Sequence, residues 1–170
     1  MRRWWIAGAG VVNVAMLVAT SPPRVEVGES VPFALELNPE QRDVWIELEY
    51  EYSPDPKLSA PYSGVSLVLA GDNLGSTGQL QLFQLPEPRL DAGVPDEMLG
   101  DAAVDAGLGA PLAVDVYLSG PVTLRAGRHT TWLLVHLDGE ADVVLDGELT
   151  LSAQYSANRT SAELHLVEVR

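Results

Sequence analysis

Carboxylates around turns are the first side chains in this chain whose spacing suggests chemistry. Asp138, Glu140 and Asp142 alternate across one predicted turn, and oxygen-rich loops of this kind bind calcium in many proteins. The glycine and the terminal glutamate of a helix-loop-helix calcium site do not occur at the expected positions. We therefore treat the three residues as a candidate calcium site, with ordinary solvated turn chemistry as the alternative.

Histidines and hydroxyl groups offer no comparable motif. A zinc site from His129, His136 and His165 requires the fold to bring them together, and their spacing does not demand it. Neither a nucleophile elbow nor a glycine-rich phosphate loop occurs. The chain has no cysteine, which excludes disulfides and thiolate metal ligands. The sequence predicts a protein that is not an enzyme and carries no cofactor.

The elements that must position these residues are strands. Apolar and polar residues alternate with a period of two from Val25 onward, as in half-buried strands. The dipeptide Asp138-Gly139 is a strong hairpin signal, and Asp146-Gly147 indicates another tight turn. The expected strands cover about 31–37, 43–52, 65–69, 79–85, 112–118, 122–124, 131–137, 149–155 and 164–169. We expect an all-β domain, an antiparallel immunoglobulin-like β-sandwich of about nine strands.

A long acidic insertion at 86–111 separates the two halves of the predicted sandwich. It is rich in proline, glycine, alanine and aspartate, and a weak helix is possible over 96–106. Long loops in compact domains are usually functional or disordered. One interpretation is a flexible insertion, and the other is an arm that docks on a partner through Asp96, Glu97, Met98, Leu99 and Asp101.

Trp45 is a further candidate partner contact. It lies on the otherwise acidic face of the predicted strand 43–52. Tryptophans in such positions are also often packed under a loop, so both readings stay open for this residue.

The first 23 residues differ from everything that follows. A basic start is followed by an uncharged apolar run from Ile6 to Ala19, which as a helix from Trp4 would span about 24 Å. A cleaved signal peptide also needs a small-x-small cleavage site, and the candidate cuts after Ala19, Thr20 and Ser21 are all poor matches. An uncleaved signal anchor is therefore favoured over a cleaved signal.

Two groups of residues suit a membrane anchor. At the start, cations and aromatic rings fit the membrane interface, namely Arg2, Arg3, Trp4 and Trp5. Within the run, small residues and one amide suit close packing against other helices, namely Gly8, Gly10, Asn13, Ala15 and Ala19. The sequence thus predicts an anchor or signal over 1–23 and an exported domain over 24–170.

The exported part is strongly acidic. The net charge of the chain is −14, and it becomes −16 when Arg2 and Arg3 are left out. Such a domain repels nucleic acid and anionic lipid headgroups, so its expected partners are other membrane or periplasmic proteins with a basic surface.

Two functional hypotheses follow. The first is a non-enzymatic accessory subunit of a bacterial membrane complex, held in the inner membrane by one helix, with its domain in the periplasm. The alternative is an immunoglobulin-like binding or adhesion module, secreted or periplasmic after signal cleavage, which binds calcium at its sandwich end.

Overall fold

A computed structural model describes residues 25–55, 62–88, 95, 97–105, 112–155 and 162–170. The described residues form nine antiparallel strands. They are β1 (Val25–Leu37), β2 (Asp43–Ser53), β3 (Tyr62–Asn73), β4 (Gly78–Leu85), β5 (Met98–Ala103), β6 (Leu112–Pro121), β7 (Gly127–Gly139), β8 (Val143–Tyr155) and β9 (Glu163–Val169).

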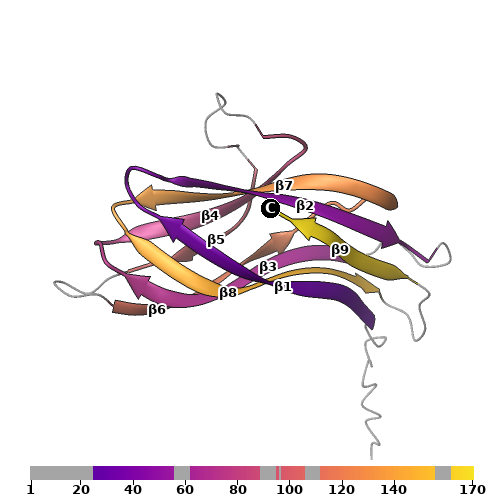
Figure 1. The fold of residues 1–170 in the computed structure, drawn as a ribbon, viewed down its shortest axis with the longest axis horizontal. Helices are drawn as coiled ribbons and strands as arrows, with labels where there is room; N and C mark the ends of the chain where they lie inside the picture. The colour runs from indigo at the N-terminus through magenta and orange to yellow at the C-terminus, as the bar shows by residue number, and fades with distance from the viewer. Residues whose placement is uncertain (1–24, 56–61, 89–94, 96, 106–111, 156–161) are drawn as a thin grey trace, which may run out of the picture.

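The strands make two packed sheets, as Figure 1 shows. One sheet has four strands in the order β1-β8-β3-β6, and the other has five in the order β5-β4-β7-β2-β9. The predicted antiparallel β-sandwich of about nine strands is confirmed. Its period-two pattern works as expected: in β2, Ile46 and Leu48 are buried between the sheets while Asp43 and Glu51 lie on the outside.

The strand order is that of a jelly roll rather than of an immunoglobulin domain. In an immunoglobulin domain several consecutive strands pair within one sheet. Here every connection except the one from β4 to β5 crosses to the other sheet. The first eight strands thus follow the two interleaved Greek keys of a jelly roll, and β9 extends the second sheet beside β2. The immunoglobulin-like form that the sequence analysis expected for the sandwich is therefore not observed in the strand order of the described residues. The sequence analysis predicted no strand order, because strand pairing is set by contacts between distant segments.

Three local expectations also need correction. The segment expected as a weak helix contains β5, whose Ala102 pairs with Leu80 of β4. Asp146 and Gly147 lie inside β8 and not in a turn. Gly139 does end β7 with a positive φ of 116°, but β7 and β8 belong to different sheets, so no hairpin forms there.

The two edges of the sandwich are closed by different contacts. On one side, Glu29 of β1 accepts a 2.7 Å hydrogen bond from the backbone N–H of Leu166 in β9, and its other oxygen lies 2.8 Å from His165. On the other side, β5 approaches β6 at Gly100 and Gly120, where an added Cβ would lie within 2.5 Å of a backbone oxygen of the facing strand. These glycines permit the close approach.

Asn73 organises one end of the sandwich. Its buried side-chain amide donates to the carbonyl groups of Ser76 and Val104, and its oxygen accepts from the N–H groups of Gly75 and Asp142. One side chain therefore fixes the connections β3–β4, β5–β6 and β7–β8 relative to one another. The four bonds use its full hydrogen-bonding capacity.

The predicted membrane segment, 1–23, lies outside the described residues. Within the part of the chain that the structure covers, no helix has the length and apolar character that a bilayer crossing requires.

Candidate protein-binding face

The outer surface of the four-stranded sheet is built by every second residue of β1, β8, β3 and β6. The inward residues, such as Leu67 and Leu149, are buried, and the residues between them point outward. Strand register places the outward positions in rows across the sheet: Ala34, Asp146, Ala70 and Asp115 form one row, and Pro32, Glu148, Val68 and Tyr117 form the next.

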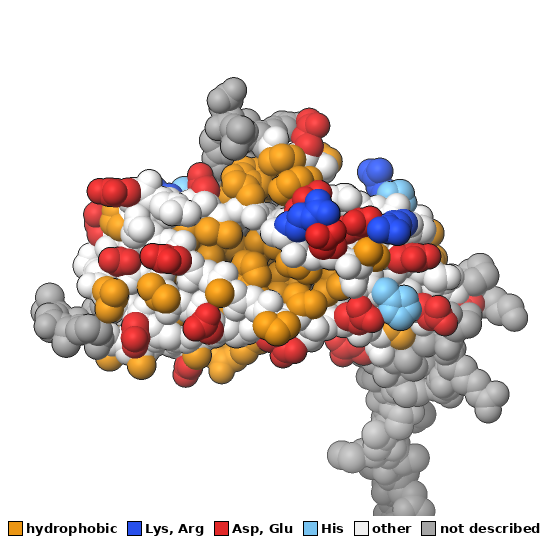
Figure 2. Space-filling model, in the orientation of Figure 1, with side chains coloured by type: hydrophobic (Ala, Val, Ile, Leu, Met, Phe, Trp, Pro, Cys, Tyr) orange, Lys and Arg blue, Asp and Glu red, His pale blue; other side chains and the backbone are white. Residues whose placement is uncertain are grey.

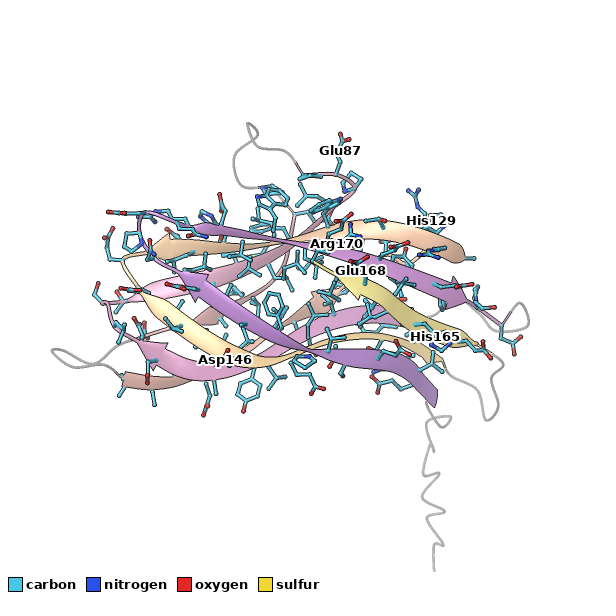
Figure 3. All side chains as sticks on the ribbon, viewed as in Figure 1. Glu87, His129, Asp146, His165, Glu168 and Arg170 are labelled. Carbon is cyan, nitrogen blue, oxygen red and sulfur yellow. The ribbon has the colours of Figure 1, made fainter. Side chains whose placement is uncertain are left out.

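The charged side chains that the structure describes on this outer surface are all carboxylates. Among the described residues it carries no lysine, arginine or histidine. Figure 3 shows Asp146 on the outer side of β8. We call this surface the acidic face; its carboxylates are Glu26, Glu36, Asp72, Asp115, Asp146 and Glu148.

An exposed apolar pair lies within the acidic face. Tyr117 is 69% exposed and Val68 is 46% exposed, and the two are register partners on β6 and β3. Glu148 pairs with Val68 from the other side. The remaining outward side chains nearby are small, such as Ala70 and Ser66. The face thus offers an exposed tyrosine on its edge strand β6. Asp115 lies two residues away on the same strand, and Glu148 lies beyond Val68 in the same row.

The outer surface of the five-stranded sheet has a different charge arrangement. Here three glutamates pair with arginines: Arg128 binds Glu49 at 2.6 Å, and Arg170 contacts both Glu47 and Glu168. The hydrogen bond from Arg170 holds the pKa of the Glu168 carboxyl below its usual value. In Figure 2 most of the blue side chains gather in one region of the visible face, among red ones.

Trp45 contributes to a second apolar cluster on this surface. It is partly buried and packs with Trp132 against the buried side chains of Phe83, Leu85 and Leu134. Trp45 therefore has both packed and accessible atoms. Its position is intermediate between the two interpretations that the sequence allowed, an exposed partner contact and a side chain packed under a loop.

The predicted docking arm is divided by the structure. Met98, Leu99 and Asp101 belong to β5, where Met98 is 44% exposed and Asp101 accepts a hydrogen bond from Gln79. Glu97 and Leu99 line a cavity at one end of the sandwich. Asp96 lies outside the described residues, as do the anchor residues near the N-terminus.

The candidate metal ligands are not brought together. Among the described residues, no group of three or more His, Cys, Asp and Glu side chains could hold a metal ion. Glu140 instead makes an ion pair with Arg42 at 3.5 Å. The histidines are also separated: His129 bonds the carbonyl of Ala126, His136 bonds Asp43, and His165 bonds Glu29.

The acidic face was missed by the sequence analysis. Its signal was present in the alternation of Val144, Asp146 and Glu148 with buried residues. The interpretation of Asp146-Gly147 as a turn broke that alternation. The pairing of β8 between β1 and β3 is a long-range contact that no local pattern encodes.

Comparisons of the chain with protein-family models, with curated proteins and with solved structures find no match.

Proposed function

We propose that the protein is a non-enzymatic, protein-binding subunit that is attached to a bacterial membrane through residues 1–23 and binds a basic partner with its acidic face. The observation that carries the binding part is the acidic face itself, with six outward carboxylates and no cationic side chain among its described residues. The attachment part rests on the sequence of residues 1–23 alone.

The size of the acidic face is suitable for a protein partner. Four strands about 4.8 Å apart and about 11 residues long give a surface of roughly 700 Å². A standard protein–protein interface buries about 800 Å² on each partner. The exposed Tyr117 is of the residue type that is enriched among the side chains that contribute most to binding at such interfaces.

The charge of the acidic face defines the chemistry of the partner. Carboxylates beside an exposed apolar pair are complemented by lysine or arginine beside an apolar pocket, and such complementarity mainly increases the rate of association and the specificity. The electrostatic field of the whole chain, with a net charge of −14, also favours association with a basic partner.

Site-specific photo-crosslinking in native membranes tests the binding part. A photoreactive amino acid at Tyr117 should capture a basic protein, whereas the same group at Thr130, an exposed position on the opposite sheet, should not. The double variant Asp115→Lys with Glu148→Lys should abolish the crosslink from position 117. Capture from Thr130 alone, or a crosslink that survives the double variant, contradicts the proposal.

Intact-mass measurement of the native protein tests the attachment part. A mass that includes residues 1–23, in protein that stays with the membrane after salt washing, is expected. A product that begins near Thr20 or Pro22 removes the anchor and leaves a secreted or periplasmic binding module, whose acidic face is tested in the same way.

A further inference from the structure

We infer that the cavity at one end of the sandwich is a binding site for a small zwitterionic molecule, such as a short peptide with a free amino group and a free carboxylate. The cavity has a volume of about 580 Å³, which lies within the range of ligand pockets. It is formed where β4, β6 and β7 meet, and the buried Tyr50 of β2 contributes to its lining. This inference does not depend on the acidic face.

Two oppositely charged side chains line the cavity without neutralising each other. Arg125 and Glu97 both border it, yet they make no ion pair within 4 Å, and neither has another ionic partner among the described residues. Arg42, Arg128 and Arg170 each contact a glutamate. Arg125 is therefore the described arginine whose guanidinium remains available to a ligand carboxylate, and Glu97 remains available to an ammonium group.

The frame around Arg125 is held in place by neutral hydrogen bonds. The Tyr50 hydroxyl accepts a 3.0 Å bond from the backbone N–H of Arg125. The Gln84 amide accepts from the backbone of Thr123, donates to the carbonyl of the same residue, and donates to the Thr131 hydroxyl. A site fixed before binding loses less conformational entropy when a ligand arrives.

The rest of the lining is mixed in character. Leu85, Leu99 and Val122 offer apolar surface, while His129 and Thr130 offer hydrogen-bonding groups. His129 uses Nε2 on the Ala126 carbonyl, which leaves Nδ1 for another partner. A ligand with an apolar body and two opposite charges matches this lining, because its body would cover Leu85, Leu99 and Val122 while its charged groups meet Arg125 and Glu97.

The probe for this inference is the dipeptide leucyl-leucine, with two analogues that each lack one charge. In the amide the carboxylate is removed, and in the N-acetyl form the ammonium is removed. Calorimetry and NMR on the full chain should show binding of the dipeptide at about 10 mM or below, with shifted amide signals for Tyr50, His129 and Thr131. Each analogue should bind more weakly by about fivefold.

Variants then assign each charge to its partner. Arg125→Gln should weaken the dipeptide about fivefold and leave the affinity of the amide unchanged, while Arg128→Gln, outside the cavity, should change neither. Glu97→Gln should weaken the dipeptide but not the N-acetyl form, with Glu87→Gln as its control. The absence of any shift at about 10 mM dipeptide, equal affinity for all three probes, or an effect of Arg128→Gln as large as that of Arg125→Gln overturns the inference.

Discussion

A single missing side chain allows two strands of the four-stranded sheet to approach closely. Gly147 lies in the middle of β8, between Phe33 of β1 and Leu69 of β3. A Cβ built there would lie 2.0 Å from the backbone oxygen of Val68 and 2.8 Å from the Cα of Leu69. Both distances are far below van der Waals contact, so the close approach of β3 to β8 at this point requires glycine.

Gly147→Ala is expected to lower the free energy of unfolding by about 2 kcal/mol, because the new methyl group must push two strands apart. The matched control is Gly64→Ala in β3 of the same sheet, where the nearest heavy atom to a new Cβ is 3.6 Å away. That variant should stay within about 0.5 kcal/mol of the parent. Urea denaturation measures both, and equal stabilities of the two variants contradict the role assigned to Gly147.

Gly147 also explains why the sequence analysis wrongly predicted a tight turn at Asp146-Gly147. The dipeptide Asp-Gly is common in tight turns because glycine accepts positive φ. The only described glycines with positive φ are Gly127 and Gly139, so Gly147 is selected for the space that it leaves and not for its backbone angle. A local pattern cannot distinguish these two reasons for a glycine, since the close neighbour belongs to a distant strand.

At the scale of elements, β1 and β9 are joined by the carboxylate of Glu29. It binds both the backbone N–H of Leu166 and the ring of His165, and it connects the edges of the two sheets. The hydrogen bond to His165 holds the pKa of Glu29 below its ordinary value of 4.5. The same bond holds the pKa of His165 above its ordinary value of 6.5, with smaller contributions from Glu163 and Glu51. Figure 3 shows His165 beside β1.

The contribution of this contact to stability should depend on pH. A lowered Glu29 pKa stabilises the fold above pH 4.5, and this contribution is lost as the pH falls through the folded-state value. A raised His165 pKa stabilises the fold below pH 6.5, and this contribution is lost as the pH rises through the folded-state value. Both contributions are therefore present together between pH 4.5 and 6.5.

Glu29→Gln separates charge from hydrogen bonding, because the amide oxygen still accepts from Leu166. In this variant the pKa of His165 should fall back toward 6.5, as measured by NMR titration of its ring protons. The difference in melting temperature from the parent should be largest between pH 4.5 and 6.5. Glu36→Gln, an exposed carboxylate on the same strand, should leave His165 unchanged. An unchanged His165 pKa in Glu29→Gln means that the contact does not form in solution.

The elements differ in how well the sequence predicts them. The strand β2 was predicted almost to the residue, because its alternation runs without interruption from Asp43 to Tyr52. The strand β5 was not, since Gly100 and Ala102 carry little pattern and the strand is defined by pairing with β4. Strand periodicity and turn residues thus predicted a sandwich, whereas strand order and the composition of its faces depend on pairings such as β1 with β8.

At the scale of the whole molecule, negative charge opposes folding. The chain carries a net charge of −14, and such self-repulsion destabilises a compact state. The arginines with ionic partners contact glutamates of the five-stranded sheet or Glu140 in a connecting segment. The acidic face therefore retains its charge without compensation among the described residues. Retaining such a surface costs stability, and the binding role proposed above would give a reason for retaining it.

Glu148→Lys is expected to stabilise the protein at low ionic strength, because it replaces repulsion from Asp115 and Asp146 by attraction. The melting temperature should rise by about 1–2 °C in about 10 mM salt, and the gain should vanish near 1 M salt, where the Debye length is about 3 Å. Glu168→Lys adds the same charge but removes the ion pair with Arg170, so it should give no gain. If both variants stabilise the protein equally, the effect comes from the net charge of the chain and not from repulsion within the acidic face. If Glu148→Lys alone stabilises while weakening the crosslink from Tyr117, the carboxylates of the acidic face are retained for the partner and not for the fold.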